Sequence, residues 1–78
     1  MPFEEIFPLV QAAAGQEVRL VDINGGRRLT HRLVEMGLTP GVRFRILQNS
    51  GGPLLLAISD ARIALGRGMA DQMNVTVD

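Results

Sequence analysis

The run from Leu29 to Gly41 constrains the fold most strongly, because it specifies a helix, its end and the turn that follows. Leu29, Leu33 and Met36 recur at positions i, i+4 and i+7, so they share one face of a helix. Gly37 comes directly after them and can adopt the left-handed conformation that ends a helix. We therefore expect a short amphipathic helix whose apolar face packs on a core.

The residues after this helix predict how it connects to the next strand. Leu38 follows Gly37 and can make the hydrophobic contact that accompanies a glycine-terminated helix. Pro40 and Gly41 suit the two central positions of a type II turn, because proline presets the first and glycine accepts the positive φ of the second. We assign structural roles in this turn to Gly37, Leu38, Pro40 and Gly41.

Short apolar segments separated by turn-forming residues indicate a mainly β protein. Val42, Phe44 and Ile46 alternate with arginines, the pattern of a strand with one buried and one exposed face. Further strands are expected at residues 18–23, 54–58, 62–65 and 74–77, and helical segments at 9–14, 27–36 and 68–72. About five strands, with a short helix inserted after the first strand, fit a strongly bent sheet that closes into a small β-barrel and hides its edges.

Length and composition limit the classes of function. The 78 residues predict a single domain over residues 1–78. The absence of cysteine excludes disulfides and thiol chemistry, and the absence of lysine excludes a phosphate-binding loop that ends in Gly-Lys. We predict no catalytic residue, no cofactor and no enzyme activity. Because no apolar run reaches the ~20 residues of a membrane helix and the N-terminus lacks the basic region of a signal peptide, we expect a cytoplasmic protein.

The outer face of the predicted helix is the candidate contact surface for a partner. Arginine is enriched where proteins bind one another, whereas the alternative is an ordinary solvated helix face. Arg27 lies on this face, and the candidate partner-binding residues are Arg28, His31, Arg32, Val34 and Glu35. Arg43 and Arg45 on the next strand either extend this surface or keep an edge strand from pairing with other chains.

His31 and Glu35 carry side chains of the kinds that bind metal ions. They are four residues apart on the predicted helix, and both imidazole and carboxylate groups bind ferrous iron or zinc. The sequence offers no third histidine or cysteine near them, and two ligands do not make a site. We interpret the pair as an ordinary i,i+4 surface interaction and predict no metal site.

The run from Arg32 to Gly41 resembles the "RL-x-E-[ML]-GL-x-PG" signature of the FeoA family, the small component of bacterial ferrous iron uptake. Further family motifs follow in register, namely Gly52-Pro53-Leu54, Ile63-Ala64-Leu65 and the segment from Ala70 to Val75. The chain departs from the family pattern at Gly52, where aspartate is common, and at Gly66 and Gly68, where charged residues are commoner.

The resemblance implies an SH3-like β-barrel with an inserted helix and a cytosolic accessory role. Family members act with FeoB, a membrane iron permease that has a cytosolic GTP-binding domain, so the membrane would be reached only indirectly through this partner. Related domains at the C-terminus of metal-dependent repressors make protein–protein contacts.

Two other functions remain open from the sequence. A small barrel could bind nucleic acid through Arg27, Arg28, Arg43 and Arg45, although a chain with eight basic and eight acidic residues lacks the usual net positive charge. Three phenylalanines, without tyrosine or tryptophan, also supply few stacking surfaces, so we expect no nucleic-acid partner. The high apolar content leaves a self-associating scaffold, and hence a homo-oligomer, as the other alternative.

Overall fold

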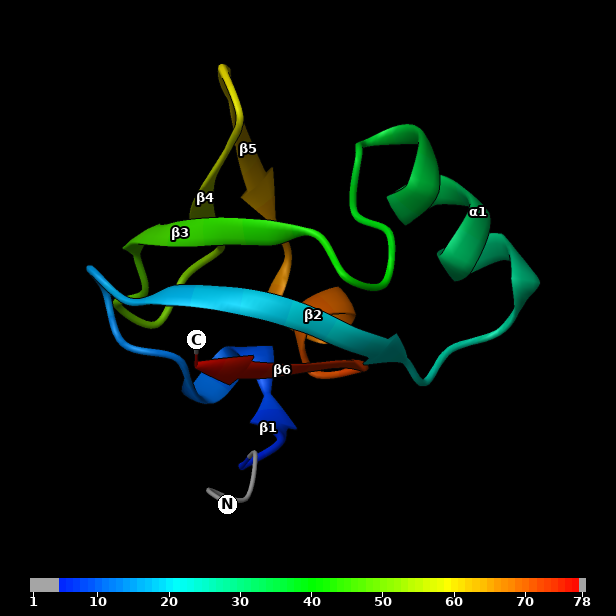
Figure 1. The fold of residues 1–78 in the computed structure, drawn as a ribbon, viewed down its shortest axis with the longest axis horizontal. Helices are drawn as coiled ribbons and strands as arrows, with labels where there is room; N and C mark the ends of the chain where they lie inside the picture. The colour runs from blue at the N-terminus through cyan, green and yellow to red at the C-terminus, as the bar shows by residue number, and fades with distance from the viewer. Residues whose placement is uncertain (1–4, 78) are drawn as a thin grey trace.

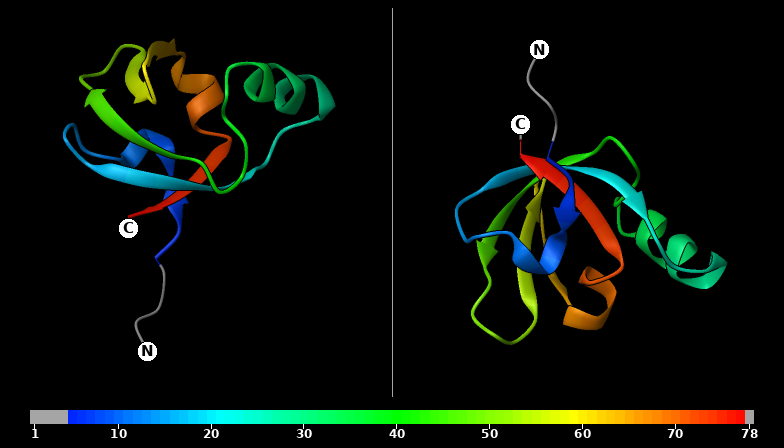
Figure 2. Two further views of the ribbon diagram at one scale, coloured as in Figure 1. Left: turned by 45° about the horizontal axis from the view of Figure 1, so that its top comes forward. Right: turned by 90° about the horizontal axis from the view of Figure 1, so that it is seen from below.

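The structure is a computed structural model that describes residues 5–77. Its strands form one six-stranded sheet in the order β1-β6-β2-β3-β4-β5, and every neighbouring pair is antiparallel. The sheet is strongly bent, and α1 projects from one end of it (Figures 1 and 2). The elements in chain order are β1 (Phe7–Pro8), the 3-10 helix η1 (Leu9–Gln11), β2 (Glu17–Ile23), α1 (Arg27–Glu35), β3 (Arg43–Gln48), β4 (Leu54–Ile58), β5 (Ala61–Leu65), α2 (Arg67–Ala70) and β6 (Met73–Val77).

The predicted fold class is confirmed, with one strand more than the sequence indicated. The added strand is β1, in which Phe7 and Pro8 pair with Val75 and Asn74 of β6 at one edge of the sheet. A two-residue strand is too short to show an alternating pattern, and proline is tolerated there because an edge strand need not donate on both sides. The inserted helix α1 consequently follows the second strand, β2, and not the first.

The helix predicted over residues 9–14 is wrong in its extent. Only a 3-10 turn forms, and Ala12 after it has extended backbone angles (φ −71°, ψ 139°). The side-chain amide of Asn49 donates hydrogen bonds to the carbonyl oxygens of Val10 (2.9 Å) and Ala12 (2.7 Å). Because these bonds occupy carbonyls that a continuing helix would use, they favour the extended exit of the chain toward β2.

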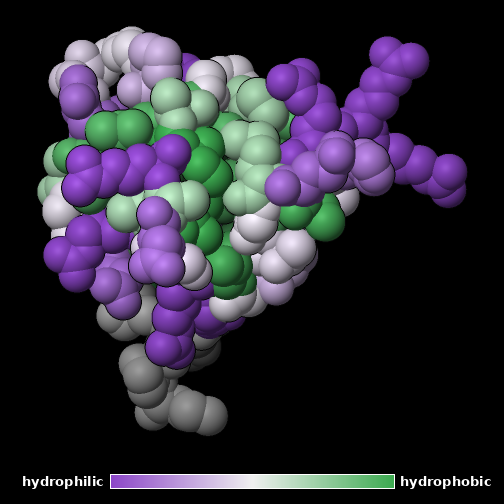
Figure 3. All heavy atoms as spheres, turned by 90° about the horizontal axis from the view of Figure 1, so that it is seen from above, coloured by the Kyte–Doolittle hydropathy of each residue, from purple (hydrophilic) through white to green (hydrophobic). Residues whose placement is uncertain are grey.

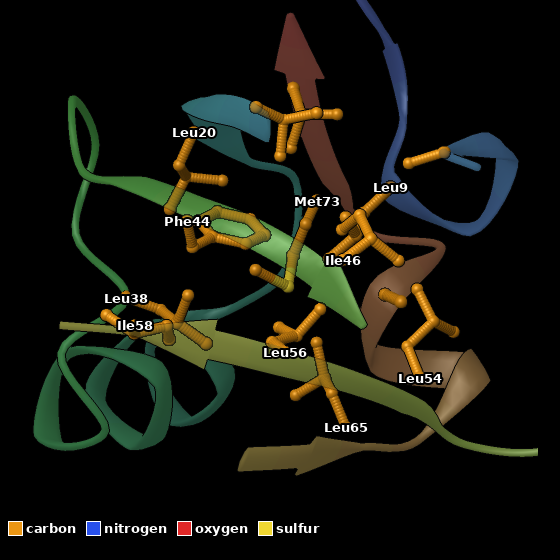
Figure 4. Close-up of a cluster of buried hydrophobic side chains, with 14 of the residues drawn as sticks. Leu9, Leu20, Leu38, Phe44, Ile46, Leu54, Leu56, Ile58, Leu65 and Met73 are labelled. Carbon is orange, nitrogen blue, oxygen red and sulfur yellow. The ribbon is translucent and has the colours of Figure 1, made fainter. Parts of the chain in front are cut away.

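The core lies inside the bend of the sheet, and alternate residues of the strands point into it (Figure 4). This alternation is clearest in β4, where Leu54, Leu56 and Ile58 are buried while the residues between them are half-buried. Leu9 of η1 and Leu38 also reach the core, so the segments outside the strands help to close it (Figure 4). The largest fully buried side chains are Leu9, Leu20, Leu33, Leu38, Ile46, Leu54, Leu56, Leu65, Met73, Val18, Val75 and Thr76.

The predicted end of α1 is confirmed in detail. Gly37 has a φ of +89°, and its N–H donates to the carbonyl of Val34 at 2.9 Å, while Leu38 N–H donates to the carbonyl of Leu33 at 2.8 Å. These two bonds define a Schellman motif, in which a left-handed residue ends the helix. The accompanying hydrophobic contact pairs Leu33 with Leu38, both completely buried. The same residues therefore end α1 and anchor it to the core.

The predicted type II turn is also confirmed, and it ties the end of α1 to the sheet. Val42 N–H donates to the carbonyl of Thr39 at 3.0 Å, and Gly41 between them has a φ of +95°. Gly41 N–H then donates to the carbonyl of Leu20 in β2 at 2.7 Å, and Leu20 N–H donates to the carbonyl of Val42 at 2.9 Å. These bonds fix the direction in which α1 leaves the barrel.

Candidate partner-binding surface

The helix α1 has one buried side and one exposed side, as its sequence pattern predicts. Leu33 is completely buried, and Leu29 and Met36 pack against the core while remaining partly exposed. The structure brings all the predicted contact residues together on the other side of this one helix. Each of them is exposed: Arg28, His31, Arg32, Val34 and Glu35. We call these five residues together with Arg27 the outer face of α1.

A shallow groove of about 740 Å³ runs over this surface. It is lined by Gly25, Gly26, Arg27, Arg28, Thr30, His31, Arg32 and Val34. Sequence reasoning identified the charged residues of the groove but missed Thr30 and the two glycines, which it treated only as chain breakers. Gly26 is the N-cap of α1 and Gly25 packs against Leu29, so their lack of side chains keeps the approach to the helix open. A pair of glycines directly before a helix is the signal that could have indicated this opening.

Among residues 5–77, one contact between a basic and an acidic side chain forms on the outer face of α1. His31 Nδ1 lies 3.1 Å from Glu35 Oε1, and these side chains are 78% and 66% exposed. The predicted i,i+4 surface interaction is therefore confirmed. Within residues 5–77, Arg27, Arg28 and Arg32 form no ion pair. Figure 3 shows hydrophilic side chains that project from the end of the molecule where α1 lies. The helix thus presents three guanidinium groups that the described part of the chain does not neutralise.

The arginines of β3 belong to a different surface. Arg45 donates to Glu17 Oε2 at 3.1 Å across the β2–β3 pair, and both side chains are about half exposed. Together with Arg43 they line a separate groove of about 280 Å³, and neither arginine lines the groove on α1. The suggestion that they protect an edge strand is wrong, because β3 lies between β2 and β4. The four arginines considered for nucleic-acid binding are thus divided between two grooves.

The described residues gather few groups that could coordinate a metal ion. His31 and Glu35 are adjacent on α1, but residues 5–77 contain no cluster of three or more histidine, cysteine, aspartate or glutamate side chains. The helices within the same range are also too short or too polar to cross a membrane. The chemistry that the outer face of α1 offers is therefore charge, hydrogen bonding and one exposed apolar side chain, Val34.

The bent antiparallel sheet around one core, with a helix inserted between β2 and β3, defines a small SH3-like β-barrel. Residues 7–77 match the model of the FeoA domain, and the chain belongs to the FeoA family. A protein from Methanocaldococcus jannaschii, provisionally named Fe(2+) transport protein A, is 34% identical over 70 residues, which cover 90% of this chain and 85% of that protein.

Solved structures agree with this assignment. The crystal structure of an iron uptake regulatory protein (FeoA) superposes with a TM-score of 0.87 at 33% identity, covering 92% of this chain and 97% of that one. A manganese-dependent transcriptional repressor also reaches a TM-score of 0.87, over 99% of this chain and 44% of that one. Its identity is only 20%, so this likeness concerns the fold alone.

Proposed function

We propose that this protein is a non-enzymatic, cytoplasmic accessory protein of ferrous iron uptake, which binds and modulates a FeoB-type membrane permease. Membership of the FeoA family supports this function, as do the names of two relatives, an iron transport protein and an iron uptake regulatory protein. The protein would reach the membrane only through its partner. Its effect would be a shift in population, because a domain that binds one state of the permease more tightly than another stabilises that state.

The observation that carries the proposed docking is the exposure of α1 (Figure 1). The helix projects from the barrel, its end is fixed by the Schellman motif and the type II turn, and its outer face contributes nothing to the core. An exposed helix that these hydrogen bonds hold at its end can contact a partner without unfolding of the domain. The proposed contact residues are Arg28, His31, Arg32, Val34 and Glu35.

The test is a binding titration between this protein and the cytosolic region of the permease from the same organism. We expect Val34→Ala to weaken binding, since Val34 is the exposed apolar side chain of the outer face, 44% accessible. Val77→Ala is the matched control, because Val77 is 49% exposed but lies on β6. Absence of binding by the folded wild-type protein at tens of micromolar would contradict the proposed function. Equal effects of the two substitutions would place the contact elsewhere.

A further inference from the structure

The charges of this protein are balanced overall but not locally. The chain has eight basic and eight acidic residues, yet three of its arginines lie within the nine residues of α1, and Glu35 is the one acidic residue of that helix. Glu35 already lies 3.1 Å from His31, so the three guanidinium groups stay unneutralised within residues 5–77. The outer face of α1 is therefore a concentrated positive surface on a protein of zero formal net charge.

The stability of the helix does not account for this distribution of charge. Arg27 and Arg28 occupy the first turn of α1, which has no acidic residue, although the helix dipole favours negative side chains at that end. Arg28 and Arg32 are also like charges one turn apart, an arrangement that disfavours the helix. Arg32 alone is well placed, because it lies in the last turn. Two of the three arginines thus oppose folding slightly, which indicates that they serve another purpose.

We propose that the outer face of α1 binds an acidic protein segment, whose carboxylates pair with Arg27, Arg28 and Arg32; this inference rests on the proposed function and specifies the chemistry of the contact. A guanidinium group presents a planar fork of donors that matches a carboxylate with two parallel hydrogen bonds. Thr30 and Val34 line the groove beside the arginines and add a hydroxyl and an apolar contact. The surface therefore fits a segment that carries several aspartates or glutamates next to an apolar side chain.

The described acidic residues argue against a second copy of this chain as the occupant. Glu17 is paired with Arg45, Glu35 is paired with His31, and Asp22 accepts a hydrogen bond of 2.7 Å from Asn74. These three acidic side chains lie on β2 and α1 and are engaged within the molecule. The other three described acidic residues, Glu5, Asp60 and Asp71, lie before β1, between β4 and β5, and after α2, so they do not form an acidic cluster. A different protein with free carboxylates is the better electrostatic complement.

The experiment measures binding of the permease's cytosolic region to three proteins: the wild type, the α1 variant Arg27→Glu/Arg28→Glu, and the control variant Arg62→Glu, whose substitution lies on β5. Arg62 is exposed and makes no ion pair within residues 5–77. We expect the α1 variant to bind at least about tenfold more weakly, and the control to bind nearly as the wild type does. Wild-type binding should also weaken as salt rises from about 0.01 M to about 1 M, where the Debye length falls from about 30 Å to about 3 Å.

Thermal unfolding distinguishes loss of contact from loss of fold. Because glutamate suits the first turn of a helix, the α1 variant should melt at or above the wild-type temperature while it binds more weakly. If the wild type binds but neither salt nor charge reversal on α1 changes its affinity, the acidic-segment inference is overturned and the proposed function survives. If the folded wild type does not bind at all, both are overturned.

A second arm uses vesicles of phosphatidylglycerol and phosphatidylcholine without any permease. Lipid phosphates also attract arginines, so this arm separates an anionic membrane from an acidic protein segment. We expect binding to these vesicles to be much weaker than binding to the permease's cytosolic region. Equal affinity for both, with the same loss on charge reversal, would overturn the assignment of an acidic protein segment.

Discussion

Replacing Gly37 with alanine tests whether a left-handed residue is what ends α1 and orients it on the barrel. Gly37 has a φ of +89°, and a Cβ atom added there would meet no atom within 4 Å. The cost of the substitution is therefore conformational and not steric. Placing an L-residue with a Cβ in the left-handed region costs about 1–2 kcal/mol. Alanine also restricts the unfolded chain, which returns about 0.4–1 kcal/mol. We therefore expect Gly37→Ala to lower the free energy of unfolding by up to about 1.6 kcal/mol, with a middle value of about 0.8 kcal/mol.

Gly68→Ala is the matched control for this prediction. Gly68 lies in α2, where the backbone is helical, and a Cβ atom there would also meet nothing within 4 Å. The chemical change and the effect on the unfolded chain are the same, so the difference between the two variants isolates the left-handed conformation. We expect Gly68→Ala to leave the domain equally stable or to raise its stability by up to about 1 kcal/mol.

Thermal or urea unfolding of the two glycine variants provides the measurement. A difference of about 1–2 kcal/mol between them corresponds to melting temperatures at least about 4 °C apart for a domain of this size. If Gly37→Ala is as stable as Gly68→Ala, the backbone at Gly37 is not constrained as described. In that case the Schellman motif would not be what fixes the end of α1.

Three further predictions concern core packing, buried hydrogen bonds and the exposed pair of His31 and Glu35. Leu33→Ala should cost about 2–5 kcal/mol because Leu33 is completely buried, whereas Val34→Ala, 44% exposed, should change stability little; similar losses in urea unfolding would contradict the described orientation of α1. Asn49→Ala should cost about 2–3 kcal/mol, because its amide binds two carbonyls and its oxygen accepts a bond of 2.7 Å from an arginine of α2; Asn74→Ala, which loses one exposed bond, should cost less than half of that in the same assay. Glu35→Gln should change the melting temperature by less than about 4 °C, since an exposed i,i+4 pair contributes about 0.3–0.5 kcal/mol, and a larger loss would show that the pair is structural.

The sequence could predict the end of α1 because the signals there are local. Gly37 and Leu38 donate to carbonyls at most five positions away, and Gly37, Pro40 and Gly41 each have a distinct backbone preference. An alternating pattern predicted β3, and short apolar segments between turn residues predicted the other later strands. The strand pattern alone fitted a small closed barrel, and the resemblance to the FeoA family identified its type as SH3-like.

The parts that sequence reasoning missed depend on contacts between distant segments. The strand β1 exists because Phe7 pairs with Val75, a partner near the other end of the chain. The helix expected after β1 stops at Gln11 because Asn49, the residue directly after β3, donates hydrogen bonds to the carbonyls of Val10 and Ala12. The groove on α1 was missed in part because glycines carry no side chain to read. No local pattern reports such long-range effects.

The central claim is that a partner binds the outer face of α1, and resonance mapping tests it most directly. Unlabelled cytosolic region of the permease is added to the ¹⁵N-labelled protein, and the amide signals of residues 5–77 are followed. We predict that the changes concentrate on residues 25–35, which contain the groove and α1, while the amides of β1 and β6 stay in place. Changes confined to the sheet, or no change with a folded protein, would contradict the claim.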